Sequence, residues 1–159
     1  MLSPLELKRA MLEALEIRPS RTHDSSAERT EDYRVQLTTE ILEKPDSLDY
    51  RVTVDFRLSP RKDAVCRFER VEVRLVGFFS LPPDTDERLV RTLIPLSCFS
   101  ILYGIARGVV AQATGMVARG PLLLPPVNFV EYWEKQKRKQ ARQAKGNQAR
   151  QPEGALTPG

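Results

Sequence analysis

Residues 97–119 constrain the fold more than any other part of the sequence, because they predict a long helix without a polar face. Its only strongly polar residues are Arg107, Gln112 and Arg119, whereas a helix on the surface of a monomer carries polar residues along one whole side. A membrane span is one interpretation, but Pro95 and the charge of Arg107 argue against an integral span. We therefore expect protein to cover this helix on every side.

Small residues recur along one stripe of the same helix, at steps of three or four residues. Small side chains in line let another backbone approach closely. In a chain of 159 residues, one small sheet can cover only one side of the helix. We therefore expect an oligomer, with a core helix inside a single chain as the alternative. The expected interface residues are Ile101, Gly104, Gly108, Ala111 and Gly115.

Three runs ahead of the helix show the alternation of β-strands. Residues 33–43 begin by alternating, and residues 49–58 alternate without a fault. Residues 64–80 change phase near Glu69, which predicts a β-bulge. Short connections indicate an antiparallel meander with one exposed face, so the fold class is α+β. In the second run, the residues that face one way are Tyr50, Val52, Val54, Phe56 and Leu58.

The N-terminal segment, residues 1–20, predicts a helix with room for a short first strand after it. Ser3-Pro4-Leu5-Glu6 has the pattern of a capping box with proline at the first helical position, so we expect a helix from Ser3 to about Glu16. Pro19 would stop it, and residues 16–20 could form the strand. The main domain is expected over residues 21–136, followed by a basic tail, residues 137–159, that we expect to be disordered.

Capping patterns place the other helices. Asp84, with a glutamate three residues later, predicts a short helix that ends before Pro95. Ser97 is expected to cap the long helix, which should run to residue 119 and end at Gly120. Asn128, again with a glutamate three residues later, predicts a last helix.

Few residues are suited to catalysis or metal binding. The single histidine, His23, lies in a polar loop, and no serine or cysteine has a base nearby in the sequence pattern. Cys66 and Cys98 lie in apolar stretches, which indicates buried thiols in a reducing cytoplasm. We therefore expect no enzymatic activity, no metal, no cofactor and a cytoplasmic location.

The net charge of +4 comes from the C-terminal end of the chain. A solvated tail is one interpretation of this cluster, and binding to nucleic acid, to ribosomes or to an anionic surface is the other. The clustered basic residues are Lys135, Lys137, Arg138, Lys139, Arg142, Lys145 and Arg150.

Residues 121–129, with the sequence PLLLPPVNF, place three leucines between prolines directly after the long helix. The leucines are too few to span a bilayer, and the prolines prevent a helix. Such a segment either packs on the core or offers a rigid apolar surface to another chain.

The sequence from residue 98 to 129 resembles the C-terminal half of the SecB family of export chaperones. The resemblance extends more weakly over residues 30–133, including GFFSL at residues 77–81 as the end of a strand. The elements that match are Cys98, Ile101-Leu102, Ala106-Arg107, Val117-Ala118-Arg119-Gly120 and Pro126-Val127-Asn128-Phe129.

The resemblance implies a four-stranded antiparallel sheet in each subunit, a short C-terminal lid helix, and long helices packed between sheets in a dimer of dimers. It also implies that non-native polypeptides bind in apolar grooves beside the long helix, the loop after it and the lid. The leucines of the loop should then be at least partly exposed. The expected client contacts are Phe78, Phe79, Tyr103, Leu122, Leu123, Leu124, Val127, Phe129 and Trp133.

The resulting hypothesis is a homotetrameric, ATP-independent holdase for unfolded or precursor polypeptides in protein export. One alternative is a SecB-like chaperone dedicated to a single partner, such as an antitoxin; another is a protein that binds nucleic acid or ribosomes through its tail. In the family, an acidic sheet face docks the SecA translocase motor, and here a mixed charge should weaken that docking. The residues of mixed charge are Arg51, Asp55, Arg57, Arg67, Glu69, Glu72 and Arg74.

Overall fold

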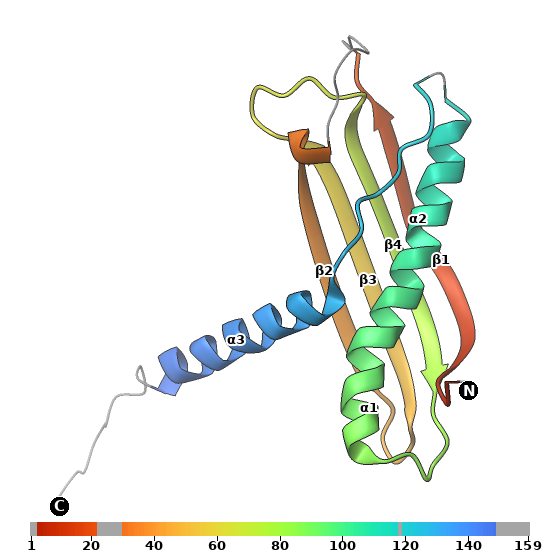
Figure 1. Ribbon diagram of the computed structural model, residues 1–159, viewed down its shortest axis with the longest axis vertical. Helices are drawn as coiled ribbons and strands as arrows, with labels where there is room; N and C mark the ends of the chain where they lie inside the picture. Colours follow the sequence, from red (N-terminus) through yellow and green to blue (C-terminus); the bar gives the residue numbers. More distant parts are fainter. Residues whose placement is uncertain (1–2, 22–29, 118, 149–159) are drawn as a thin grey trace, which may run out of the picture. The chain divides into compact units, whose positions relative to one another are not determined.

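Four antiparallel strands and two consecutive helices build the first of two compact units, residues 1–126, and residues 127–159 form the second. The computed structural model describes residues 3–21, 30–117 and 119–148 (Figure 1). The fold class is α+β, as predicted. The strands are β1 (Glu6–Pro19), β2 (Tyr33–Glu43), β3 (Asp49–Pro60) and β4 (Phe68–Ser80), in the order β1-β4-β3-β2. The helices are α1 (Glu87–Leu93), a π-helical turn (Ile94–Cys98), α2 (Phe99–Gly115) and α3 (Phe129–Gln148), with a 3₁₀ turn (Thr30–Asp32) before β2.

The buried face of the sheet is the one that the alternation of β3 predicts. All five of its inward residues, from Tyr50 to Leu58, are at most 6% exposed. Residues 71, 73, 75 and 79 of β4 are buried on the same face, and the pairing of β4 with β1 skips Glu69, where the phase change predicts a bulge. Helix α2 lies across this face (Figure 1). At Gly77 the two elements approach closely, because a Cβ there would lie 2.8 Å from Leu102 Cδ2.

Strand β1 occupies the segment for which the sequence predicts a helix, so that prediction is wrong. All 14 residues of β1 lie along β4, from the pair Glu6 and Ser80 to the pair Pro19 and Phe68. Its residues are mostly good helix formers, but such preferences amount to less than about 1 kcal/mol per residue and yield to strand pairing and packing. The short strand expected at residues 16–20 is the end of this long one.

Two bulges explain why the apolar residues of β1 do not show the regular alternation of a strand. The pairing with β4 skips Lys8 and Glu13, and each skipped residue shifts the alternation by one position. As a result, Leu7, Leu12 and Leu15 all lie opposite residues of β4 whose side chains are buried. Bulges can therefore conceal the alternation by which a strand is recognised in a sequence.

The helices differ from the sequence prediction at their ends. Asp86, rather than Asp84, caps α1 by accepting hydrogen bonds from two backbone N–H groups of that helix. Ser97 caps no helix, because the π-helical turn carries the chain from α1 into α2 and accommodates Pro95. Helix α2 ends at Gly115, four residues earlier than expected.

The helical run from Glu87 to Gly115 is long and apolar enough to cross a membrane, judged by length and composition alone. One side of α2 is nevertheless buried on the sheet, and the core helix of a folded domain has the same composition. The buried residues of α2 are Phe99, Leu102, Tyr103, Ala106, Val110 and Thr114.

Helix α3 begins where the capping pattern predicts, and Asn128 Oδ1 accepts a hydrogen bond from the N–H of Glu131 at 3.3 Å. The helix continues to Gln148, so the expected disorder is wrong for residues 137–148. Strong helix formers (Glu, Lys, Gln, Arg and Ala) dominate this stretch. The remainder of the expected tail, residues 149–159, and His23 lie outside the described residues.

Candidate functional site

The leucine loop, residues 121–126, is held against α2 by three hydrogen bonds. The three side chains of α2 that make them lie four and seven residues apart, so they share one side of the helix. They hold the loop along about three helical turns. The bonds join Leu122 N to Thr114 Oγ1 (2.8 Å), Arg107 Nε to Leu124 O (3.1 Å) and Tyr103 Oη to Pro125 O (2.6 Å).

The three leucines of this loop point alternately into the core and into solvent. Leu122 and Leu124 are 6% and 1% exposed, whereas Leu123 is 70% exposed. The alternation is that of an extended chain, in which successive side chains point to opposite sides. The expectation that all three leucines are exposed is therefore wrong for two of them. Of the three leucines, only Leu123 is exposed enough to contact another molecule.

Tyr103 anchors the loop rather than forming part of its surface. The residue is 3% exposed, and its ring lies 5.5 Å from that of Phe56. Burial raises the pKa of Tyr103 to about 12, so its hydroxyl stays protonated and able to donate to Pro125 O. In this structure Tyr103 is too buried to contact a bound polypeptide, contrary to the sequence expectation. The anchors Arg107 and Thr114 carried no sequence signal beyond being polar residues within an apolar helix.

Phe78 and Phe79 point to opposite faces of the sheet, so they cannot line the same groove beside α2. Phe79 is 1% exposed on the α2 side, close to Gly77. Phe78 is half-buried on the other face, where its neighbour on β3 is Arg51. Strand alternation alone dictates this separation, and the sequence prediction did not take it into account.

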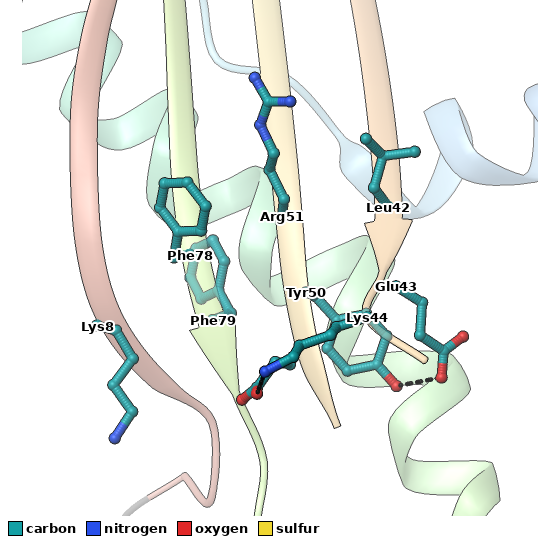
Figure 2. Close-up of a pocket in the computed structure, with 9 residues that line it drawn as sticks. Lys8, Leu42, Glu43, Lys44, Tyr50, Arg51, Phe78 and Phe79 are labelled. Carbon is teal, nitrogen blue, oxygen red and sulfur yellow. Dashed lines mark hydrogen bonds and ion pairs between the residues drawn. The ribbon is translucent and has the colours of Figure 1, made fainter. Parts of the chain in front are cut away.

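A hollow of about 450 Å³ lies near Phe78, and residues of all four strands line it (Figure 2). Its apolar side chains include Phe78 and Leu42, and basic side chains stand around them. Tyr50 at its border donates a hydrogen bond of 3.5 Å to Glu43. The pKa of Tyr50 is raised, mainly by burial and to a lesser extent by the nearby Glu43 carboxylate. The lining residues are Lys8, Leu42, Glu43, Lys44, Asp49, Tyr50, Arg51, Phe78 and Phe79.

The sheet face opposite α2 carries a network of ion pairs, as its mixed charge predicts. Strand β1 contributes Glu13 and Glu16. The sequence analysis did not place these residues on the sheet, because it assigned their segment to a helix. Exposed pairs stabilise little, about 0–1 kcal/mol each, but they leave the face without a strong excess of either charge. The pairs are Arg51–Glu13, Arg57–Asp55, Arg57–Glu72, Arg70–Glu16, Arg70–Glu72, Arg74–Glu13 and Arg74–Asp55.

The expected oligomer stripe lies on the side of α2 away from the sheet. Ile101 is 38% exposed, Gly104, Gly108 and Gly115 are exposed, and Ala111 is half-buried. A Cβ at Gly104 or Gly108 would meet none of the described atoms within 4 Å. Each glycine costs a helix about 0.5–1 kcal/mol relative to alanine, so packing within this chain does not explain them. Their role at an interface stays a prediction.

Several exposed apolar side chains were not singled out from the sequence. Leu12 and Leu15 belong to the edge strand β1 and were assigned to a helix, while Met116 and Val65 gave no periodic signal. Together with Leu123 they are large apolar side chains that the first unit exposes to solvent. The exposed fractions are 47% for Leu12, 40% for Leu15, 40% for Val35, 62% for Val65 and 79% for Met116.

The remaining expected client contacts, Val127, Phe129 and Trp133, belong to the second unit. Phe129 and Trp133 are four residues apart and therefore share a side of α3. The Phe129 ring meets Tyr132 edge-on at 6.2 Å, and the Lys137 ammonium lies 5.8 Å from the centre of the Trp133 ring. Their contact with a client stays a prediction.

The thiols are buried, as expected. Cys66 and Cys98 are both free and buried, and burial raises the pKa of Cys98 to about 12, so its thiolate is absent at neutral pH. Within residues 3–21, 30–117 and 119–148, no group of three or more His, Cys, Asp or Glu side chains is placed to hold a metal ion.

A four-stranded antiparallel sheet with a long helix across one face is the architecture of the SecB-like chaperones. A solved structure of a SecB-like chaperone from Mycobacterium tuberculosis, in complex with a ChAD peptide from the HigA1 antitoxin, has a TM-score of 0.57 to this chain. The match covers 79% of this chain and 91% of the solved one at 15% sequence identity, which shows a shared fold.

The sequence defines the family. The family model described as preprotein translocase subunit SecB matches residues 14–140, and the chain therefore belongs to the SecB family. A protein-export protein SecB from Rhodospirillum centenum is 32% identical over 66 residues, which are 42% of this chain and 39% of that relative. The matched segment thus spans less than half of the relative's length.

Proposed function

We propose that this protein is an ATP-independent holdase that binds non-native polypeptides in the cytoplasm, in the service of protein export. The observation that carries the proposal is Leu123, which is 70% exposed on a loop whose neighbouring leucines are buried. The protein thus holds an apolar side chain in water on a rigid support. Membership of the SecB family supports the same function.

The proposed mechanism is binding by burial of apolar surface. Prolines at 121, 125 and 126 restrict the loop, and the hydrogen bonds to α2 fix it. Little entropy is therefore lost when a client docks. Apolar contact has no directional requirement, so one surface can accept many sequences. Binding and release of this kind need no nucleotide and no covalent step.

We also propose that the functional form is a homotetramer in which the stripe on α2 contacts another subunit. Gly104 and Gly108 leave open space beside the helix, and a second helix could approach there closely. Sedimentation velocity at micromolar concentration tests this assembly. A well-folded monomer under those conditions would contradict it.

The holdase activity is tested with reduced, carboxymethylated α-lactalbumin, a chain that cannot refold. The expected result is saturable binding by calorimetry without nucleotide, with a negative heat-capacity change from apolar burial. Folded α-lactalbumin is the matched control and should not bind. Equal binding of both forms would contradict the proposal.

A chaperone dedicated to one partner is the second candidate, and the solved M. tuberculosis structure favours it because that SecB-like protein holds an antitoxin peptide. Competition separates the two functions. A general holdase is displaced from its host partners by unfolded α-lactalbumin at micromolar concentration, whereas a dedicated chaperone keeps its partner. SecA docking is not part of the proposal, because the ion pairs on the sheet face leave no strongly acidic surface for it.

A further inference from the structure

Helix α3 continues for 15 residues beyond Trp133 without an apolar side chain larger than alanine. A helix that packs on a core needs an apolar side, and one that lies in a membrane interface needs apolar residues opposite its charges. This part of α3 has neither. Its function therefore depends on its polar and charged side chains.

Four basic residues of this segment share one side of the helix. Lys135, Arg138, Lys139 and Arg142 follow the spacing i, i+3, i+4, i+7, which places them within an arc of about 100° at 3.6 residues per turn. All four are exposed. Lys135 also pairs with Glu131 at 2.7 Å, but both side chains remain more than half exposed, so water screens this pair. We call these four residues the basic stripe.

The charge of the segment is uncompensated along the chain. Residues 135–152 contain seven Lys and Arg residues and no Asp or Glu. The side of the helix opposite the basic stripe carries one further cation, Lys137, together with Gln140 and Ala144. A dense array of negative charges would lower the mutual repulsion of the basic side chains.

We propose that the basic stripe binds the phosphate backbone of nucleic acid, without sequence preference. A duplex carries one negative charge per about 1.7 Å of its axis, and the basic stripe places four cations within about 10 Å of helix length. Lysine and arginine contacts to phosphates supply affinity but no sequence readout. The basic stripe shares no residue with the leucine loop, and the inference does not depend on holdase activity.

Salt dependence gives the proposal a quantitative form. Four cations that displace condensed counterions give a slope of log K against log salt of about −3.6 on a duplex and about −2.8 on a single strand. Removal of three of the four cations should reduce the duplex slope to about −0.9 by the same relation.

Fluorescence anisotropy of labelled 20-base-pair RNA and DNA duplexes, titrated with the full chain from 50 to 200 mM NaCl, measures this slope. The test variant is Arg138→Gln with Lys139→Gln and Arg142→Gln, since glutamine retains helix propensity. The control removes three exposed charges from the first unit, by Arg34→Gln, Lys44→Gln and Lys62→Gln. We expect the test variant to bind at least tenfold more weakly at 50 mM NaCl and the control to stay within threefold.

Three results would overturn the inference: no duplex binding by the parent at 50 mM NaCl, equal loss in the control and test variants, or binding to phosphatidylserine vesicles but not to duplexes. A scrambled duplex should bind as well as the first, and a clear preference would contradict binding through phosphates alone. Binding of unfolded α-lactalbumin by the test variant should be unchanged, so failure of this inference and failure of the holdase proposal are distinguishable.

Discussion

The leucine loop allows two functions of one short segment to be separated by neighbouring substitutions. Leu124 is 1% exposed and Leu123 is 70% exposed. Truncation of a buried leucine to alanine costs about 2–5 kcal/mol, so Leu124→Ala should lower the melting temperature by roughly 4–20 °C. A surface substitution such as Leu123→Ser should change stability by no more than about 0.5 kcal/mol.

Client binding should be affected more by Leu123→Ser than by Leu124→Ala, the reverse of the order for stability. Full burial of a leucine stabilises a complex by about 1.5–3 kcal/mol, and Leu123 has about two thirds of that surface to bury, or roughly 1–2 kcal/mol. The Leu123→Ser variant should therefore bind a client about 5- to 30-fold more weakly. Leu124→Ala, tested below its melting temperature, should bind nearly as well as the parent because its side chain is absent from the surface.

Two measurements on each variant decide between these roles: the melting temperature by circular dichroism and the Kd for reduced, carboxymethylated α-lactalbumin by calorimetry. The matched control is Leu89→Ser, which changes a leucine that is 42% exposed on α1, away from the loop. This control should change neither number appreciably.

Each outcome refutes a separate step. If Leu124→Ala melts with the parent, the loop is not part of the core, and the alternation of its leucines is wrong. If Leu123→Ser binds the client as tightly as the parent, the binding surface lies elsewhere on the molecule. If Leu89→Ser loses as much affinity as Leu123→Ser, binding follows apolar surface in general and the loop has no special role.

Three further predictions concern packing and charge. Gly77→Ala should lower the free energy of unfolding by about 1–3 kcal/mol, because the new Cβ would lie 2.8 Å from a buried side chain. Gly104→Ala is the control and should not lower it, since that position faces open space. Urea unfolding measures both. Gly108→Leu should shift sedimentation toward smaller species with the secondary structure intact, and an unchanged assembly would exclude the stripe as interface. Burial raises the pKa values of Tyr103 and Cys98 to about 12 from 10 and 9, so the unfolded chain loses these protons first. The melting temperature should therefore fall as pH rises from about 9 to 12, and less so in Tyr103→Phe.

Local sequence patterns predicted the elements whose periodicity is undisturbed. The inward residues of β3, the bulge of β4 and the cap of α3 at Asn128 all follow from spacing and capping chemistry. Strand β1 could not be identified in this way, since Ser3-Pro4-Leu5-Glu6 has a capping pattern and the bulges at Lys8 and Glu13 break the alternation of the strand. Only the pairing with β4 reveals its true alternation, and that pairing joins segments about 60 residues apart.

The sequence predicted which residues lie at the candidate site but not the directions in which their side chains point. The leucine loop was singled out by its prolines, yet which leucines are buried depends on the hydrogen bonds to Tyr103, Arg107 and Thr114 across the loop. The two phenylalanines at the end of β4 were assigned to one surface, although strand geometry separates them. Alternation alone shows that the three leucines cannot all face one way, but only the contacts with α2 decide which of them are buried.

The stripe on α2 and the exposed side chains around the leucine loop differ in shape, and this difference indicates what each surface can bind. The stripe on α2 is flat, because Gly104 and Gly108 present no side chain. A flat helix surface gains contact only from a partner of matching shape held at a fixed distance, such as a second copy of the same helix. Leu123 and Met116 instead project into solvent, at 70% and 79% exposed. Projecting, adaptable side chains can contact partners of many shapes. This difference supports the proposal that the stripe serves subunit assembly and that the leucine loop binds variable polypeptides.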